Sequence, residues 1–221
     1  MSYLQISSDY QNPMMMAFEV VERKGFGHPD SLADALANEV SIAYSRYCLD
    51  HFGLILHHNV DKLYIGAGHY RNDFGLCERL QPVQVRTNGR ISNSFGGESI
   101  DIGDIQTRAI GRYLHSVIPR LTADDLLIIP NATQRTKVPH WFTPRTREDV
   151  PDADNLKAND TAFCVAHWPP TPVESLVYRL ERYFWEPQNG ITVPKFPEIG
   201  QDIKIFAMRE RNSVEITLCV P

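Results

Sequence analysis

The sequence predicts an α+β fold, in which helices pack on mixed or antiparallel sheets. Helical periodicity recurs in three separated segments, near residues 30–51, 102–118 and 171–184. Short β-branched segments lie between them without the regular strand–helix alternation of a doubly wound sheet. The 221 residues, 43% of them hydrophobic and 22% charged, suffice for one large globular domain or two small ones.

The first helix is predicted from Asp30 to about His51, because apolar residues recur there every three or four positions. These residues are Leu32, Leu36, Val40, Ala43 and Tyr47. Gly53 follows as a helix stop. The partly alternating segment "LILHHNVDKLYIGAG" then predicts a strand near residues 62–66.

The segment "PVQVRTNGRI", residues 82–91, predicts two strands joined by a turn at Asn88 and Gly89. Asn-Gly supplies the positive φ angles that a tight hairpin requires. A second helix is predicted from Ile102 to Ile118, where Pro119 ends it, and "DLLIIP" at 125–130 predicts a short buried strand.

The third helix begins at "TPVE". Thr171 is the expected N-cap, Pro172 the first helical residue and Glu174 the partner in a capping box. Two strands are predicted after it, at residues 202–207 and 214–220, and the second alternates regularly.

Residues 131–160 are polar and proline-rich, with no apolar period. So long a loop is usually functional or mobile, and two interpretations stand: a solvated loop of mixed charge, or a lid over an anionic ligand. Its charged residues are Arg135, Lys137, Arg145, Arg147, Glu148, Asp149, Asp152 and Asp154. With a hinge at 151–160, the sequence predicts one α+β unit over 1–150 and a second, incomplete one over 151–221.

The net charge of −5 provides no general electrostatic attraction to nucleic acid or an anionic membrane. No apolar run reaches the length of a bilayer span, and the N-terminus lacks the pattern of a secretory signal. The four cysteines are far apart and form no C-x-x-C pair, so we expect free thiols, a cytoplasmic setting and no structural zinc.

The stretch "ERKGFGHPDS", residues 22–31, places Gly25 and Gly27 directly before the first helix. Glycines allow close backbone approach, and a helix N-terminus favours an anion. One interpretation is a plain loop with Asp30 as N-cap. The other is a Mg²⁺-polyphosphate site, in which Asp30 binds the metal and His28 donates to a phosphate.

Two further polar clusters are candidates for ligand binding. In "HHNVDK", residues 57–62, the adjacent histidines point to opposite faces of a strand, so they do not share a metal easily. Lys62 is either a phosphate ligand or a surface lysine. In "ANDTAF", residues 158–163, Asn159 and Asp160 form either a turn or part of a substrate site.

Together these stretches resemble the archaeal-type S-adenosylmethionine synthetase, or methionine adenosyltransferase, family. "EVVERKGFGHPDS", "LHHNVDK", "ANDT" and "GQDIKIFAMRE" stand in the family's order and spacing, with "SRYCLDHFG" and "IDIGDI" also similar. The similarity runs from about Glu19 to Thr217, and Ser31 follows "GHPD" as in the archaeal type. It implies repeated α+β units and active sites shared between subunits, so a homo-oligomer is expected.

The resemblance implies that methionine sulfur attacks C5′ of ATP and that the triphosphate leaves whole, to be hydrolysed to pyrophosphate and phosphate. Mg²⁺ is the implied cofactor, with K⁺, and ATP is a substrate. A neutral sulfur nucleophile needs no general base, so catalysis depends on positioning and on neutralising the leaving group.

The resemblance also assigns the site residues. They are His28, Lys62 and Asp160 as catalytic; Glu22, Gly27, His28, His58, Asn59, Lys62, Asn159 and Asp160 as nucleotide- or substrate-binding; and Asp30 as metal ligand, with Asp202 and Lys204 as further candidates.

The sequence departs from the family in two ways. The family's glycine-rich stretch is missing after "DLLIIP", since no glycine lies between Gly111 and Gly190. The chain also has about half the family's length. It is therefore a fragment, half of a split enzyme, or a shortened relative. The alternatives to a synthetase are a regulatory or complementary subunit and an adenosyltransferase that uses another nucleophile.

Overall fold

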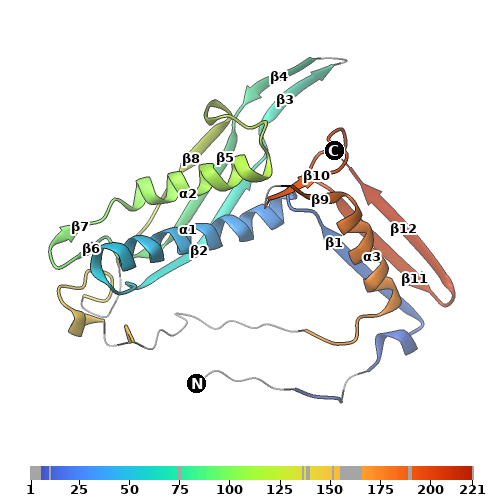
Figure 1. Ribbon diagram of the computed structural model, residues 1–221, viewed down its shortest axis with the longest axis horizontal. Coiled ribbons are helices and arrows are strands. Elements are labelled where there is room, and N and C mark those ends of the chain that lie inside the picture. Colours follow the sequence, from blue (N-terminus) through green and yellow to red (C-terminus); the bar gives the residue numbers. More distant parts are fainter. Residues whose placement is uncertain are drawn as a thin grey trace. The chain divides into compact units, whose positions relative to one another are not determined.

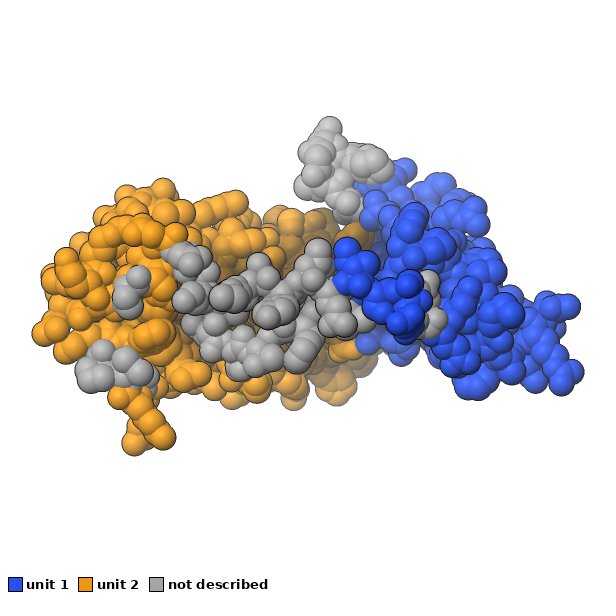
Figure 2. Space-filling model, turned by 90° about the horizontal axis from the view of Figure 1, so that it is seen from below, with its two compact units in different colours: residues 1–25, 165–221 blue, residues 26–164 orange. Residues whose placement is uncertain are grey.

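The computed structural model describes residues 6–9, 11–73, 76–135, 137, 140–150, 152–154, 166–188 and 191–220. The chain divides into two compact units, which Figure 2 shows in different colours. Unit 1 combines residues 1–25 with 165–221, and unit 2 contains residues 26–164. The predicted α+β class is confirmed, because helices and mixed or antiparallel sheets occur together.

Unit 2 is built on a mixed three-stranded sheet in the order β2 (His58–Gly66), β5 (Val83–Ile91) and β8 (Leu126–Ile129). β2 and β5 are antiparallel, whereas β5 and β8 are parallel. The helices α1 (Pro29–Phe52) and α2 (Ile102–Val117) lie side by side and pack on this sheet (Figure 1).

Two apolar clusters form the core of unit 2. One joins α1 and α2 to β5 through buried leucine, isoleucine and valine side chains, and Leu36, Val40 and Ile110 are completely buried. The other lies around Tyr44 near the C-terminal end of α1. The Tyr44 hydroxyl donates to the Ser92 carbonyl oxygen at 2.7 Å, which satisfies the buried polar group.

Short elements complete unit 2. The hairpins are β3 (His69–Asp73) with β4 (Leu76–Gln81), and β6 (Ser94–Phe95) with β7 (Glu98–Ser99). The 3-10 turns are η2 (Ala123–Asp125) and η3 (Arg147–Asp149).

Unit 1 contains the antiparallel sheet β1 (Phe18–Lys24), β11 (Lys204–Glu210) and β12 (Ser213–Cys219), in that order. The helix α3 (Pro172–Tyr183) covers one face, where Val173 and Val177 pack against Ile205 and Ala207. A 3-10 turn, η1 (Pro13–Met15), precedes β1, and the hairpin β9 (Trp185–Gln188) with β10 (Ile191–Pro194) follows α3.

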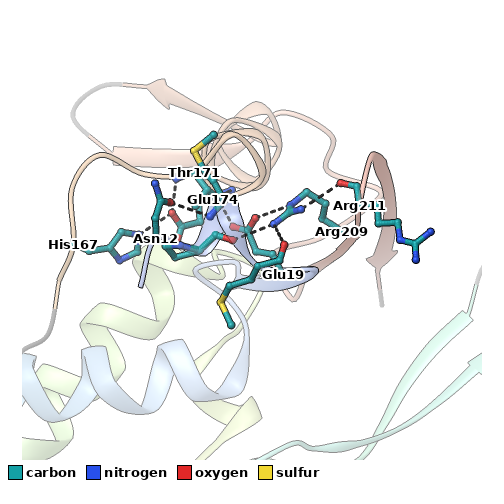
Figure 3. A network of polar contacts seen from close by, with 10 residues as sticks. Asn12, Glu19, His167, Thr171, Glu174, Arg209 and Arg211 are labelled. Atoms are coloured by element: carbon teal, nitrogen blue, oxygen red, sulfur yellow. Dashed lines mark hydrogen bonds and ion pairs between the residues drawn. The ribbon is translucent and has the colours of Figure 1, made fainter. Parts of the chain in front are cut away.

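A buried polar network connects β1, the start of α3 and β11 in unit 1 (Figure 3). Glu19 of β1 accepts hydrogen bonds from Thr171, the N-cap of α3, and from Arg209 of β11. Arg209 also donates to the carbonyl oxygens of Pro13 and Met16, at 3.1 and 3.3 Å. One guanidinium therefore ties the N-terminal turn to the sheet.

The structure confirms the three predicted helices, and the caps explain where they begin. Thr171 and Glu174 form the expected capping box, with Pro172 at the first helical position. Gly53 ends α1 in the left-handed conformation at φ 70°. The strands predicted at 62–66, 125–130, 202–207 and 214–220 are present as β2, β8, β11 and β12, with shifted bounds.

The predicted turn at Asn88 and Gly89 is wrong, because β5 runs unbroken through both residues. Strand β2 has an irregularity between Asn59 and Lys62 where it pairs with β5. A Cβ atom on Gly89 would lie 2.0 Å from the Asn59 carbonyl oxygen. The glycine is therefore needed for close strand approach, a requirement that depends on the partner strand and not on the local sequence.

The observed units group the N-terminal residues with the C-terminal part of the chain. β1 pairs along its whole length with β11, so residues 1–25 join residues 165–221. The expected division into 1–150 and 151–221 remains a prediction about domains. No helix among the described residues has the length and apolar character that a membrane span requires.

Candidate functional site

The "GHPD" stretch forms the start of α1, and His28 is its N-cap. The His28 Nδ1 accepts a hydrogen bond from the Asp30 amide at 3.2 Å, and Pro29 occupies the first turn. Because Nδ1 is the acceptor, the hydrogen of the neutral ring lies on Nε2, which is the donor left for a ligand. The interpretation of Asp30 as N-cap is therefore wrong.

Asp30 lies in the first turn of α1, and its side chain is exposed. Its carboxylate is the one acidic group in that turn. Mg²⁺ bound to a polyphosphate typically takes one or two carboxylates and fills its shell with phosphate oxygens and water. Asp30 fits that role only together with a substrate, since nowhere in the described chain do three His, Cys, Asp or Glu side chains converge on a metal-sized site.

The two glycines of the loop are both buried. Gly25 packs so closely that a Cβ atom would lie 2.7 Å from Ile203 Cγ1 and 3.0 Å from the Gln201 carbonyl oxygen. Its amide also donates to the Ile203 carbonyl oxygen at 2.8 Å. Gly25 is thus explained by packing within unit 1, whereas the proposed role of Gly27 beside a nucleotide stays a prediction.

His58 begins β2 and uses both ring nitrogens inside unit 2. Its Nε2 lies 2.7 Å from the Ser41 hydroxyl, and its Nδ1 lies 2.9 Å from the Leu56 carbonyl oxygen. Burial lowers the pKa of His58 below its ordinary value, although the hydrogen bond with the Leu56 carbonyl oxygen acts in the opposite direction and raises it. A nucleotide would have to replace one of these contacts to bind the ring.

Lys62 is exposed, with its Nζ 2.8 Å from the Asp61 carboxylate. Leu63 and Ile65 of the same strand pack against the helical core, so the alternation of β2 directs Lys62 and Tyr64 to the opposite face of the sheet. Lys62 and α1 therefore lie on different sides of the sheet in unit 2.

The "HHN" stretch also contacts α1 at some distance from the "GHPD" stretch, which forms the start of that helix. His58 contacts Ser41, eleven residues after Asp30 in the sequence, which is roughly 16 Å along an α-helix. Asn59, at the irregularity in β2, is half-buried. Within unit 2, the described candidates thus form two separate groups rather than one closed site.

Glu22 lies on β1 in unit 1, where the sheet brings it to Lys204 of β11. The Glu22 carboxylate is 2.7 Å from Lys204 Nζ and 3.4 Å from Lys24 Nζ. The hydrogen bond from Lys204 is the main cause that holds the pKa of Glu22 below its ordinary value. The sequence showed both residues as candidates but not their pairing, which follows from strand register alone.

Asn159 and Asp160 lie outside the described residues, so their assigned roles stay predictions. Asp202, a further candidate, is exposed and lies two residues before the start of β11. In the preceding long loop, Arg145 pairs with Asp149 and Arg147 with Asp154, so these basic side chains have partners within the loop itself.

The comparisons with known proteins identify the family. The S-adenosylmethionine synthetase family model matches residues 4–221, and the chain belongs to this family. An uncharacterised protein of Streptococcus pyogenes serotype M3 is 38% identical over 221 residues, which cover 99% of this chain and 55% of that protein.

Two archaeal relatives carry the name S-adenosylmethionine synthase. The protein of Methanococcoides burtonii is 37% identical over 203 residues, covering 91% of this chain and 48% of the relative. The protein of Thermoplasma volcanium is 34% identical over 200 residues, which cover 90% of this chain and 47% of the relative. The resemblance predicted from the motifs is confirmed, and the chain spans about half the length of the curated relatives it matches.

Replacing His28 with alanine is expected to destabilise unit 2 by about 1 kcal/mol, because the Asp30 amide loses its cap. His28→Asn should retain most of this stability, since asparagine is a good N-cap. Urea unfolding followed by circular dichroism measures both variants. Equal stability of His28→Ala and the wild type would contradict the capping role. His28→Asn is then the variant for ligand experiments, because it keeps the helix start and removes the ring.

Proposed function

We propose that the chain is part of a methionine adenosyltransferase, which forms S-adenosylmethionine from ATP and methionine. The observation that carries this proposal is the match of nearly the whole chain to the S-adenosylmethionine synthetase family. We further expect a cytoplasmic, reducing setting, in which the exposed Cys219 remains a free thiol.

The chemistry asks the protein for positioning and for positive charge. The methionine sulfur attacks C5′ of ATP as the bond to the triphosphate oxygen breaks, and no proton leaves the nucleophile. The barrier falls when both substrates are aligned and when donors meet the charge that develops on the leaving triphosphate. The triphosphate is then hydrolysed to pyrophosphate and phosphate.

The described residues can take part in this reaction as follows. His28 donates from Nε2 to the triphosphate at the start of α1, while Asp30 binds Mg²⁺, which neutralises phosphate charge when present. Lys62 is an exposed cation that a phosphate can draw away from Asp61. Roles for Gly27, His58, Asn59, Asn159 and Asp160 beside the nucleotide or methionine, for Glu22 ahead of the loop, and for K⁺ are further parts of the proposal.

We propose that a second chain, another copy or a complementary one, completes the site. Lys62 faces away from α1 within unit 2, and Asp30 lies in the first turn of that helix. The chain also covers only about half of its curated relatives. Because Lys62 and α1 lie on different sides of the sheet of unit 2, Lys62 and Asp30 cannot surround one substrate unless other parts of the enzyme complete the site.

The alternative function is a regulatory or complementary subunit without activity of its own. It is favoured by the same half-length coverage. A third possibility is an adenosyltransferase with another nucleophile, which is suggested by the absence of glycine between Gly111 and Gly190. A methionine-independent adenosylated product would support this third function.

The test is to incubate the purified chain with ATP, methionine, Mg²⁺ and K⁺, and to measure S-adenosylmethionine by mass spectrometry together with phosphate release. Asp30→Asn is expected to abolish the product, because the metal loses its carboxylate. Asp34→Asn is the matched control, since Asp34 is an exposed aspartate one turn further along α1. It should leave activity unchanged.

Equal activity of Asp30→Asn and the wild type would remove the assigned metal site. Without product from the chain alone, the same assay with a complementary chain separates a split enzyme from an inactive relative. Light scattering with and without that chain measures association. A monomer that neither associates nor turns over ATP would exclude both versions with a partner.

A further inference from the structure

The loop after β8 contains a segment that packs on the core of unit 2. We call residues 140–150 and 152–154 the latch segment. Phe142 and Val150 are 3% and 1% exposed, and Val150 belongs to the apolar cluster around Tyr44. The Gly96 amide donates to the Pro144 carbonyl oxygen at 3.2 Å. This part of the loop is therefore docked by a few contacts rather than fully solvated.

His57, which no part of the proposed function uses, meets the latch segment directly. Its ring stacks on Trp141 with centroids 4.1 Å apart and an interplanar angle of 18°. The Phe142 ring lies edge-on to the His57 ring, with centroids 6.4 Å apart. The His57 Nε2 lies 3.3 Å from the Asp152 carboxylate. One buried imidazole, 6% exposed, thus contacts both ends of the segment.

The backbone of His57 is anchored away from the latch segment. Its carbonyl oxygen accepts hydrogen bonds from the Ser92 amide at 3.1 Å and the Ser92 hydroxyl at 2.8 Å. By contrast, His57 Nε2 and Asp152 Oδ1 are buried and lack a hydrogen-bond partner among the described residues. The contact between them is electrostatic only. His57 is the fixed side of the junction, and the segment is the side that can separate.

The charged and titratable groups around His57 come from two directions. Asp152 faces it from the latch segment and favours a proton on the ring. His58, the first residue of β2, follows it directly in the chain, and the pKa of His58 is itself lowered by burial and by the neighbouring His57. Arg90 of β5 lies over the Phe142 ring at 5.8 Å. Burial outweighs the attraction of Asp152, so the pKa of His57 lies below its ordinary value.

We propose that His57, Trp141 and Asp152 form a pH-sensitive latch, which holds the latch segment on the core at neutral pH and releases it when His57 is protonated. A protonated ring in the docked position is a buried charge with one imperfectly placed carboxylate as compensation. Separation of the segment exposes the ring to water. The segment keeps its own surface ion pairs, Arg145 with Asp149 and Arg147 with Asp154, so its release does not require unfolding of the sheet.

The sign of the pH effect follows from linkage. The released state has an ordinary histidine pKa and the docked state a lower one, so the released state binds more protons in this window. The docked state is fully favoured above the ordinary pKa of about 6.5 and loses stability as the pH falls below it. Acidification therefore opens the latch. This inference does not depend on the proposed enzymatic activity.

The test is hydrogen–deuterium exchange of the full chain between about pH 7.5 and about pH 5.5, the range over which histidine titrates, corrected for the intrinsic pH dependence of exchange. Peptides from the latch segment should lose protection at the lower pH, while peptides from α2 keep theirs. His57→Gln should abolish this difference. His115→Gln is the matched control, because His115 is an exposed histidine of unit 2, and it should retain the difference.

His57→Phe preserves a buried aromatic ring against Trp141 and serves if His57→Gln fails to fold. Trp141 fluorescence provides a second readout, since release of the segment separates the indole from the His57 ring and exposes it to water, which is expected to shift its emission to longer wavelength at the lower pH. Unchanged protection of the latch segment at low pH would overturn the proposal. So would a pH response that persists in both His57 variants, or a loss of protection in α2 that accompanies the loss in the segment.

Discussion

Replacing Arg209 with methionine is expected to destabilise unit 1 by roughly 3–5 kcal/mol, the range for removing one partner of a buried ion pair. The Arg209 and Glu19 side chains are 15% and 7% exposed, and Nε lies 3.1 Å from the carboxylate. Without the guanidinium, the Thr171 hydroxyl is the side-chain donor that Glu19 retains among the described residues. Urea unfolding followed by circular dichroism measures the loss.

Arg108→Met is the matched control, because Arg108 and Asp104 form an ion pair with side chains 73% and 46% exposed. Its expected cost is below about 1 kcal/mol, as for surface pairs in general. The double replacement Glu19→Leu with Arg209→Met should recover much of the loss, since no buried charge then remains. Equal costs for Arg209→Met and Arg108→Met would contradict the buried network of Figure 3.

Replacing Gly89 with alanine is expected to destabilise unit 2 by about 3 kcal/mol, at the upper end of the usual cost of overpacking. The added Cβ would lie 2.0 Å from the Asn59 carbonyl oxygen and 3.1 Å from the Val60 Cα atom. Both neighbours are backbone atoms of β2, so relief requires the strands β2 and β5 to separate. Urea unfolding measures this cost as well.

Gly111→Ala is the control for this prediction. Gly111 lies within α2 and has no atom within 4 Å of an added Cβ. Alanine is the better helix former, so this variant should be more stable by up to about 1 kcal/mol. A neutral Gly89→Ala variant would show that β2 can move away from β5 at little cost.

The helices could be predicted because their signals are local. The apolar period of α1 and the caps of α3, Thr171 with Glu174 and Pro172, depend on residues within one or two turns. The candidate residues at the start of α1 could be found in the same way. Their detailed roles could not, because the sequence pattern favoured Asp30 as the N-cap, whereas in the structure the Nδ1 of His28 accepts the hydrogen bond from the Asp30 amide.

Pairing between distant segments was beyond sequence reasoning. Asn88 and Gly89 carry the composition of a hairpin turn, yet the neighbouring strand β2 makes them part of β5. Glu22 and Lys204 are 182 positions apart (204 minus 22), and only the register of β1 with β11 places their charges together. His57 and Asp152 are joined in the same way by the docking of a segment that has no periodic signal.

The sequence by itself determined the α+β class, the limits of the helices and the family, because each rests on short-range periodicity, caps or ordered motifs. Only the tertiary structure decided which strands pair, that Lys62 and α1 lie on different sides of a sheet, and that His57 is buried against Trp141. Those features depend on contacts between residues far apart in the chain, whose free energy no local pattern records.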